Sequence, residues 1–150
     1  VAVELIADGF HLHPDVLRMA AGAAGPERVL LVTDAMAAAG MPDGQFRLGG
    51  LNVGVRDGQA RVVHDDGQPG SIAGSTLTMA EAFRFMTSLT GRLDTVAHMA
   101  STNAARHLGL LDVGRIEAGC RADLCVVDGT GTLQRVMQAG RWLPEPAPGP

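Results

Sequence analysis

One carboxylate, Asp34, stands where a short apolar run meets a loop of small residues. The run at 29–33 is VLLVT, and the loop extends over 35–44. In (β/α) barrels, polar side chains at the carboxyl ends of the strands face the active site, where an aspartate can move protons between a bound water and a leaving group. An aspartate that caps a helix or closes a turn is also common after a strand. The local sequence alone favours this second, structural role.

Two histidines, His11 and His13, form His-Leu-His just after the first apolar run. Residues two apart in an extended segment share a face, so the pair could bind a metal ion such as zinc. Alternatively, one histidine faces a ligand and the other is an incidental loop residue. The metal-binding His-x-His of hydrolase barrels follows the first barrel strand, whereas only one more buried strand is predicted after this pair. We therefore predict that these histidines are not a metal pair.

A third polar segment, Gly-Ser-Thr at 74–76, precedes a strongly helical stretch. Ser75 or Thr76 could cap that helix, although neither has an acidic residue three positions later. Backbone N–H groups in this segment could also hold a polar ligand. A simple cap is the favoured interpretation. The remaining isolated polar residues are assigned no chemical role: His64, His98, His107, Asp123 and Asp128.

The elements around these residues alternate between strand and helix. Apolar runs at 3–7 and 28–33 predict two buried strands, and the Ala- and Leu-rich segment at 15–24 predicts a helix between them, which makes a βαβ unit. The rest of the chain predicts, in order, a β-hairpin at about 46–63, a loop containing Asp65–Gly67 and Pro69–Gly70, helices at 78–89 and 95–108 joined by 92–94, and strands at 122–127, 132–138 and 140–143.

Composition excludes several classes of protein. The 12 basic and 16 acidic side chains give a net charge of -4, which argues against a general nucleic-acid binder. No apolar run approaches the roughly 20 residues of a membrane span. Cys120 and Cys125 lack the spacing of a zinc site and are too few for a disulfide framework, so we predict a cytoplasmic protein. Because the chain enters an apolar strand at once, we also expect it to be truncated.

Three short motifs are more specific together than apart: IADGFH at 6–11, LVTDA at 31–35 and GSTLTM at 74–79. Their order and spacing resemble the C-terminal half of the N-acetylglucosamine-6-phosphate deacetylase family, which lies within the amidohydrolase superfamily. Two later stretches, 100–106 and 114–124, resemble the segment in which that superfamily leaves its barrel. The resemblance covers nearly the whole chain except the proline-rich end.

The resemblance implies an α/β fold, the C-terminal part of a (β/α)8 TIM-like barrel with C-terminal strands of a small β-sandwich. Residues 1–112 would supply the last two barrel strands and the following helices, with the hairpin inserted. Residues 113–143 would be the returning sandwich strands. We expect a disordered tail at 144–150, where proline is frequent.

The resemblance also implies roles for individual residues. Asp34 falls on the catalytic aspartate, which reverses the local interpretation, and His11 falls on the histidine that contacts the phosphate end of the substrate. Further positions fall on segments that line the sugar: Asp8, Gly9, Phe10, Ile72, Ala73 and Gly74. A divalent metal, zinc or a similar ion, would activate the water. Its ligands, a glutamate and two histidines, would lie on earlier strands outside this chain, so none is expected here.

The implied partner is a small amino-sugar phosphate, and the full-length protein would be a homodimer. The chain alone would be inactive because it lacks the metal ligands. Two alternatives stay open. One is a related amidohydrolase, similar to a dihydroorotase or hydantoinase, that acts on cyclic amides. The other is a non-catalytic remnant, or a subunit that binds a sugar phosphate.

Overall fold

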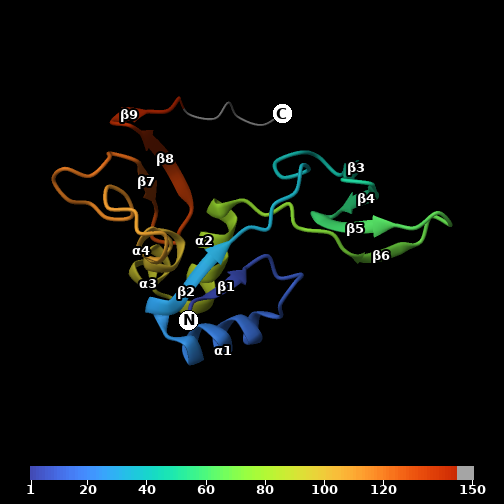
Figure 1. Ribbon diagram of the computed structural model, residues 1–150, viewed down its shortest axis with the longest axis horizontal. Coiled ribbons are helices and arrows are strands. Elements are labelled where there is room, and N and C mark those ends of the chain that lie inside the picture. Colours follow the sequence, from blue (N-terminus) through green and yellow to red (C-terminus); the bar gives the residue numbers. More distant parts are fainter. Residues whose placement is uncertain (145–150) are drawn as a thin grey trace.

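The computed structural model describes residues 1–144, and Figure 1 shows their arrangement. The predicted disordered tail lies, except for residue 144, outside the described residues. The elements are β1 (Val3–Ile6), α1 (Pro14–Ala24), β2 (Val29–Val32), β3 (Gly44–Leu48), β4 (Leu51–Arg56), β5 (Gln59–Val63), β6 (Pro69–Ile72), α2 (Met79–Thr90), α3 (Leu93–Ala97), α4 (Asn103–His107), β7 (Leu124–Val127), β8 (Leu133–Gln138) and β9 (Arg141–Trp142), with short helical turns at Pro26–Arg28 and His98–Thr102.

The predicted βαβ unit is confirmed. Strands β1 and β2 pair in parallel, with Val3 opposite Val29 and Ile6 opposite Val32, and α1 connects them. Their apolar side chains share one core with α1, α2 and the α3 region. The fully buried side chains of this core include Leu17, Val29, Met86, Val96 and Met99. Because both strands end at the same edge, the segments that follow them lie side by side.

The predicted hairpin is present but is part of a larger sheet. Strands β4 and β5 pair antiparallel across the turn at residues 57–58, and β3 and β6 extend this pair to a four-stranded antiparallel sheet, β3-β4-β5-β6. Residues 69–72, predicted as loop because of Pro69 and Gly70, are the edge strand β6. Proline is tolerated as the first residue of an edge strand, and Arg61 fixes β6 by donating from Nη1 to the Gly70 carbonyl at 2.9 Å. In Figure 1 this sheet projects from the body that holds β1 and β2.

The second predicted helix is interrupted and begins earlier than expected. Helix α3 starts at Leu93, inside the predicted connector, and a π-helical turn at His98–Thr102 joins it to α4. The buried Asn103 side chain donates to the carbonyls of Pro26 and Val29, at 2.7 and 2.8 Å. These two bonds tie the helical segment to the beginning of β2.

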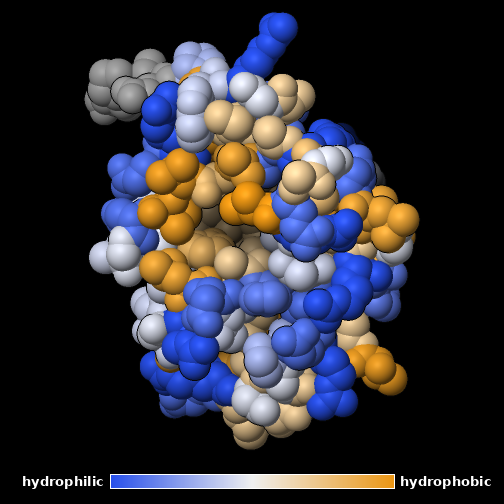
Figure 2. All heavy atoms as spheres, turned by 90° about the vertical axis from the view of Figure 1, so that its left-hand side faces the viewer, coloured by the Kyte–Doolittle hydropathy of each residue, from blue (hydrophilic) through white to orange (hydrophobic). Residues whose placement is uncertain are grey.

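The last three strands form a separate antiparallel sheet in the order β7-β8-β9, as the sequence predicted for the strands themselves. Large apolar side chains are exposed around this sheet and in the loop before it: Leu108, Leu110, Leu111, Ile116, Val126, Leu133 and Trp142. Figure 2 shows hydrophobic side chains gathered around a hollow on the face that lies at the left of Figure 1. Among residues 1–144, no helix has the length and apolar character needed to cross a membrane.

Candidate active site at the carboxyl edge of β1 and β2

Asp34 follows the end of β2 in a left-handed backbone conformation, with φ of 51°. Few residues other than glycine adopt this conformation, although aspartate and asparagine tolerate it better than most. The preceding Thr33 hydroxyl accepts a hydrogen bond from the Ala35 N–H at 3.3 Å. The Asp34 side chain is 54% exposed, so its carboxylate is open to solvent or to a ligand.

Ser75 fixes the backbone on both sides of Asp34. Its N–H donates to the Asp34 carbonyl at 2.8 Å, and its carbonyl accepts from the Met36 N–H at 2.8 Å. Its hydroxyl donates to the Thr33 carbonyl at 2.6 Å and accepts from the Leu77 N–H at 2.9 Å. Ser75, which is only 3% exposed, therefore links the end of β2 to the segment that leads into α2 through these hydrogen bonds.

The predicted helix cap was therefore wrong. Neither Ser75 nor Thr76 caps α2, because the Thr76 hydroxyl donates to the Gly58 carbonyl at 2.6 Å. The cap is Thr78, whose hydroxyl accepts from the Glu81 N–H, while the Glu81 carboxylate accepts from the Thr78 N–H. The signal was present in the sequence as Thr-x-x-Glu, two residues beyond the segment considered.

His11 lies beside Asp34 and is held by Asp8. Its Nδ1 is 2.7 Å from Asp8 Oδ2, and its Nε2 is 3.9 Å from Asp34 Oδ2. The other Asp8 oxygen accepts the backbone N–H groups of Phe10 and His11, at 2.8 and 2.9 Å. The structure thus brings the predicted catalytic residue and the predicted phosphate contact together at one edge of the sheet.

The environment of Asp8 stabilises its ionised form. Burial by itself raises the pKa of this carboxyl. The hydrogen bonds from the His11 backbone and ring and from the Phe10 backbone outweigh burial, so the pKa lies below its ordinary value. The Asp8 side chain is only 7% exposed, so its negative charge lies within the loop after β1 and is stabilised there by hydrogen bonds.

The two histidines of the His-Leu-His segment have different surroundings. His13 caps α1, where its Nδ1 accepts from the Asp15 N–H at 3.3 Å, and its side chain is 70% exposed. The His11 side chain is 22% exposed and is directed to Asp8 and Asp34. The two rings are thus directed to different partners, His11 to Asp8 and Asp34, and His13 to Asp15.

The second predicted lining segment, Ile72–Gly74, reaches the site through its backbone. Gly74 has φ of +67°, and a Cβ at this position would lie 3.1 Å from the Asp34 carbonyl oxygen. Ala73 is buried and donates its N–H to the Ala60 carbonyl at 3.1 Å. Glycine at 74 therefore allows the chain to pass close to the Asp34 loop.

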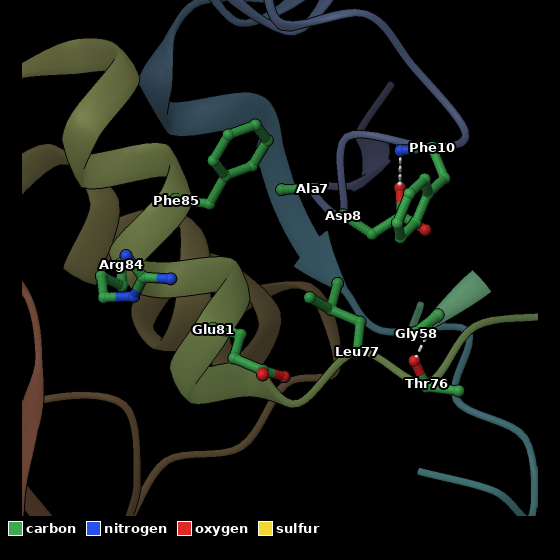
Figure 3. Close-up of a pocket in the computed structure, with 9 residues that line it drawn as sticks. All are labelled: Ala7, Asp8, Phe10, Gly58, Thr76, Leu77, Glu81, Arg84 and Phe85. Carbon is green, nitrogen blue, oxygen red and sulfur yellow. Dashed lines mark hydrogen bonds between the residues drawn. The ribbon is translucent and has the colours of Figure 1, made fainter. Parts of the chain in front are cut away.

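A pocket of about 230 Å³ opens next to the Asp8 loop, and Figure 3 shows its lining. Asp8 and Phe10 are the only predicted site residues in it. The others were not predicted as site residues and come from the insert, from α2 and from the segment before α2: Gly58, Thr76, Leu77, Glu81, Arg84 and Phe85, with Ala7 from the end of β1. The Phe85 ring points from α2 toward Ala7 in Figure 3.

The donor atoms at this edge do not by themselves make a metal site. Within residues 1–144, no three His, Cys, Asp or Glu side chains are grouped so that they could hold a metal ion. Asp34 Oδ2 and His11 Nε2 are two donors 3.9 Å apart, and Asp8 is engaged on the opposite side of the His11 ring. A catalytic zinc ion usually takes three protein ligands, so this edge could contribute to such a site but not complete it.

Residues 1–143 match the sequence model of the amidohydrolase family, and the chain belongs to this family. The resemblance seen in the motifs is confirmed by relatives over most of the chain. It is 39% identical over 142 residues to N-acetylglucosamine-6-phosphate deacetylase of Lysinibacillus sphaericus, covering 94% of this chain and 35% of the relative. It is 41% identical over 141 residues to a protein of Escherichia coli K12 provisionally named N-acetylgalactosamine-6-phosphate deacetylase, covering 93% of this chain and 81% of the relative.

The solved structures give the same result for the fold. The N-acetyl-D-glucosamine-6-phosphate deacetylase of Mycobacterium smegmatis, a mutant in complex with N-acetyl-D-glucosamine-6-phosphate, superposes with a TM-score of 0.85 at 44% identity. The match covers 95% of this chain and 37% of that structure. The chain is thus an α/β protein whose fold matches the corresponding part of these deacetylases, and it spans about a third of the length of most relatives that it matches.

Proposed function

We propose that this chain is the C-terminal part of a metal-dependent deacetylase. The whole enzyme would hydrolyse N-acetylglucosamine-6-phosphate to glucosamine-6-phosphate and acetate. One observation carries the proposal: a half-exposed carboxylate, Asp34, lies at the carboxyl end of a parallel strand with His11 Nε2 only 3.9 Å away. Strands β1 and β2 would be the last two strands of a (β/α)8 barrel within residues 1–112. Residues 113–143 would return to a small β-sandwich.

The chemistry assigned to Asp34 follows from its exposure and position. In the reaction, a water oxygen attacks the acetyl carbonyl carbon, and the bond between that carbon and the sugar nitrogen breaks. Asp34 would take a proton from the water and deliver it to the departing amine, a step that general acid–base catalysis typically accelerates by about 10²–10⁴-fold. His11 would bind the phosphate end of the substrate, and the backbones of Asp8–Phe10 and Ile72–Gly74 would line the sugar.

A divalent metal ion, zinc or similar, is expected in the whole enzyme because family members use one to activate water. Its ligands would lie upstream of the residues described, and chelation should abolish activity. Removal of the metal by a chelator, followed by addition of Zn²⁺, tests this part of the proposal. We also expect the whole enzyme to be a homodimer, which light scattering would test.

The test of Asp34 uses the protein extended upstream to its natural start, assayed for acetate release from N-acetylglucosamine-6-phosphate. Asp34→Asn removes the charge and keeps a residue that tolerates the left-handed backbone. It should lower kcat by about 10²-fold or more. Asp57→Asn is the matched control, because Asp57 has the same φ of 51° but lies at the turn between β4 and β5. Equal activity of the two variants would refute the role of Asp34.

A second sugar, N-acetylgalactosamine-6-phosphate, is favoured by a specific observation. Two relatives from Escherichia coli that match at 41% identity are named deacetylases of this epimer, one of them provisionally. The same assay should therefore compare the two phosphates and the unphosphorylated N-acetylglucosamine. Hydrolysis of a cyclic amide such as dihydroorotate releases no acetate, so it should be followed separately by the opening of the ring. Turnover of the cyclic amide alone would favour the related-amidohydrolase alternative.

A non-catalytic role is favoured by the length of one relative. The chain covers 81% of the provisionally named Escherichia coli K12 protein, so a relative of similar length exists. Purified residues 1–150 should be tested for binding of glucosamine-6-phosphate and for hydrolysis. Binding without hydrolysis in both the short and the upstream-extended forms would favour this alternative over the enzyme.

A further inference from the structure

The Asp8 carboxylate is occupied by its own loop through both oxygens. Oδ1 accepts the N–H groups of Phe10 and His11, at 2.8 and 2.9 Å, and Oδ2 lies 2.7 Å from His11 Nδ1. The side chain is only 7% exposed, so little of it can meet a ligand. The Asp8 side chain therefore contacts His11 and the loop backbone, and little of it contacts solvent.

This contact determines which nitrogen of His11 carries a proton. An ionised carboxylate has no hydrogen to donate, so the 2.7 Å contact requires that Nδ1 be the donor. The neutral ring then has an unprotonated Nε2, and a charged ring has an N–H on both nitrogens. In either state, Nε2 has no hydrogen-bond partner among residues 1–144, since its distance of 3.9 Å to Asp34 Oδ2 is too long for a hydrogen bond.

We propose that Asp8 is a positioning residue that holds His11 with Nδ1 protonated and directs Nε2 toward the substrate beside Asp34. Asp8 would thus not contact the sugar through its own side chain. The part of this inference that concerns the substrate depends on the proposed function. The part that concerns the ring depends only on the hydrogen bonds within the loop.

The variant Asp8→Asn gives a distinctive expectation. The asparagine Oδ1 is still needed to accept the two backbone N–H groups, so its NH₂ group must face the ring. An NH₂ group only donates, and Nδ1 of His11 would then have to accept. The proton of the neutral ring therefore moves to Nε2, the nitrogen that faces Asp34. A carboxylate that orients a histidine in a catalytic triad has the same effect when it is replaced by its amide.

The ring is tested in the chain itself by ¹⁵N NMR of the histidine nitrogens, at a pH about two units above the ordinary histidine pKa of about 6.5. The ¹⁵N signals of His11 are identified as those that are lost in the variant His11→Gln. We expect the Nδ1–H form of His11 in the wild type and the Nε2–H form in Asp8→Asn. Asp15→Asn is the matched control, because Asp15 lies beside His13 with 73% of its side chain exposed, and should leave His11 unchanged. An Nε2–H form in the wild type overturns the proposal, as does an unchanged tautomer in Asp8→Asn.

The kinetic test uses the upstream-extended protein with N-acetylglucosamine-6-phosphate. In the wild type, Nε2 can donate to a phosphate oxygen only when the ring is charged, because the neutral ring has no proton on Nε2. Asp8→Asn leaves a neutral Nε2–H donor there, so KM should rise by about 10-fold, the difference between a charged and a neutral hydrogen bond, and kcat should change less than KM. Asp15→Asn should change neither. An unchanged KM, or a fall in kcat larger than the rise in KM, contradicts the positioning role toward substrate. If the wild type has no deacetylase activity, the proposed function fails while the NMR result still decides the role of Asp8.

Discussion

The substitution Ser75→Ala should destabilise the fold more than its small size suggests. The Ser75 hydroxyl is a donor to the Thr33 carbonyl and an acceptor for the Leu77 N–H, at 2.6 and 2.9 Å. Alanine leaves both groups without this partner at a position that is 3% exposed. Each buried polar group that loses its hydrogen bond costs about 1–3 kcal/mol, so the free energy of unfolding should fall by about 2 kcal/mol or more.

The measurement is denaturant unfolding of the chain by linear extrapolation, with the m value unchanged if the native state keeps its compactness. The matched control is Ser88→Ala on the exposed side of α2, where the hydroxyl donates only to the Phe85 carbonyl one turn earlier. That change should stay within about 0.5 kcal/mol of the wild type. If the free energies of unfolding of the two variants differ by less than about 0.5 kcal/mol, the hydrogen bonds of the Ser75 hydroxyl do not stabilise the fold as inferred.

Three further predictions concern the same chain. Gly74→Ala should cost about 1 kcal/mol more unfolding free energy than Gly91→Ala, because both glycines have φ of +67° but only the first would place a Cβ near a neighbour, 3.1 Å from the Asp34 carbonyl oxygen. Asp8→Asn should lower the free energy of unfolding most above the ordinary aspartate pKa of about 3.9, because the lowered pKa of Asp8 means that its ionised form stabilises the fold. This loss of stability should disappear as the pH falls through the lowered pKa. Measuring unfolding at a series of pH values checks it. Thr78→Ala removes half of the capping box of α2 and should cost about 1 kcal/mol in the same unfolding assay.

The sequence predicted the central elements because their patterns were unambiguous. The run Val29–Val32 is too short for a helix and apolar throughout, which is typical of a buried parallel strand. Strand β6 was missed because Pro69 and Gly70 are residues of turns as well as of edge strands. Its formation depends on pairing with β5, in which Arg61 lies opposite Ile72. Such a contact between distant segments leaves no mark in the local sequence.

The candidate site residues could be proposed from the sequence one at a time, but their proximity could not be predicted. Asp8 and Asp34 each follow the end of a strand by two residues, and the register places Ile6 opposite Val32. Only this register brings the two loops level, and a shift of the pairing would separate them. Neither periodicity nor residue type specifies the register of two short parallel strands. The cap at Thr78 is a different case, because its signal, Thr-x-x-Glu, is local and is present in the sequence.

The insert between Ala35 and Ser75 begins and ends at hydrogen-bonded neighbours, which form its base. This pairing limits how strongly the rest of the insert can affect the conformation of Asp34. The chain leaves β2 at Ala35 and comes back at Ser75, and these two residues form a parallel bridge. The bonds from Ser75 to Asp34 and Met36 close the base, whereas Leu48 and Leu51, on either side of the β3–β4 turn, are exposed. Two of the hydrogen-bonded residues of this base, Met36 and Ser75, are buried, and the sheet beyond them has its own core, so we expect few changes at an exposed turn to reach Asp34. We therefore expect the conformation of Asp34 to depend on residues at the base of the insert more than on its exposed β3–β4 turn.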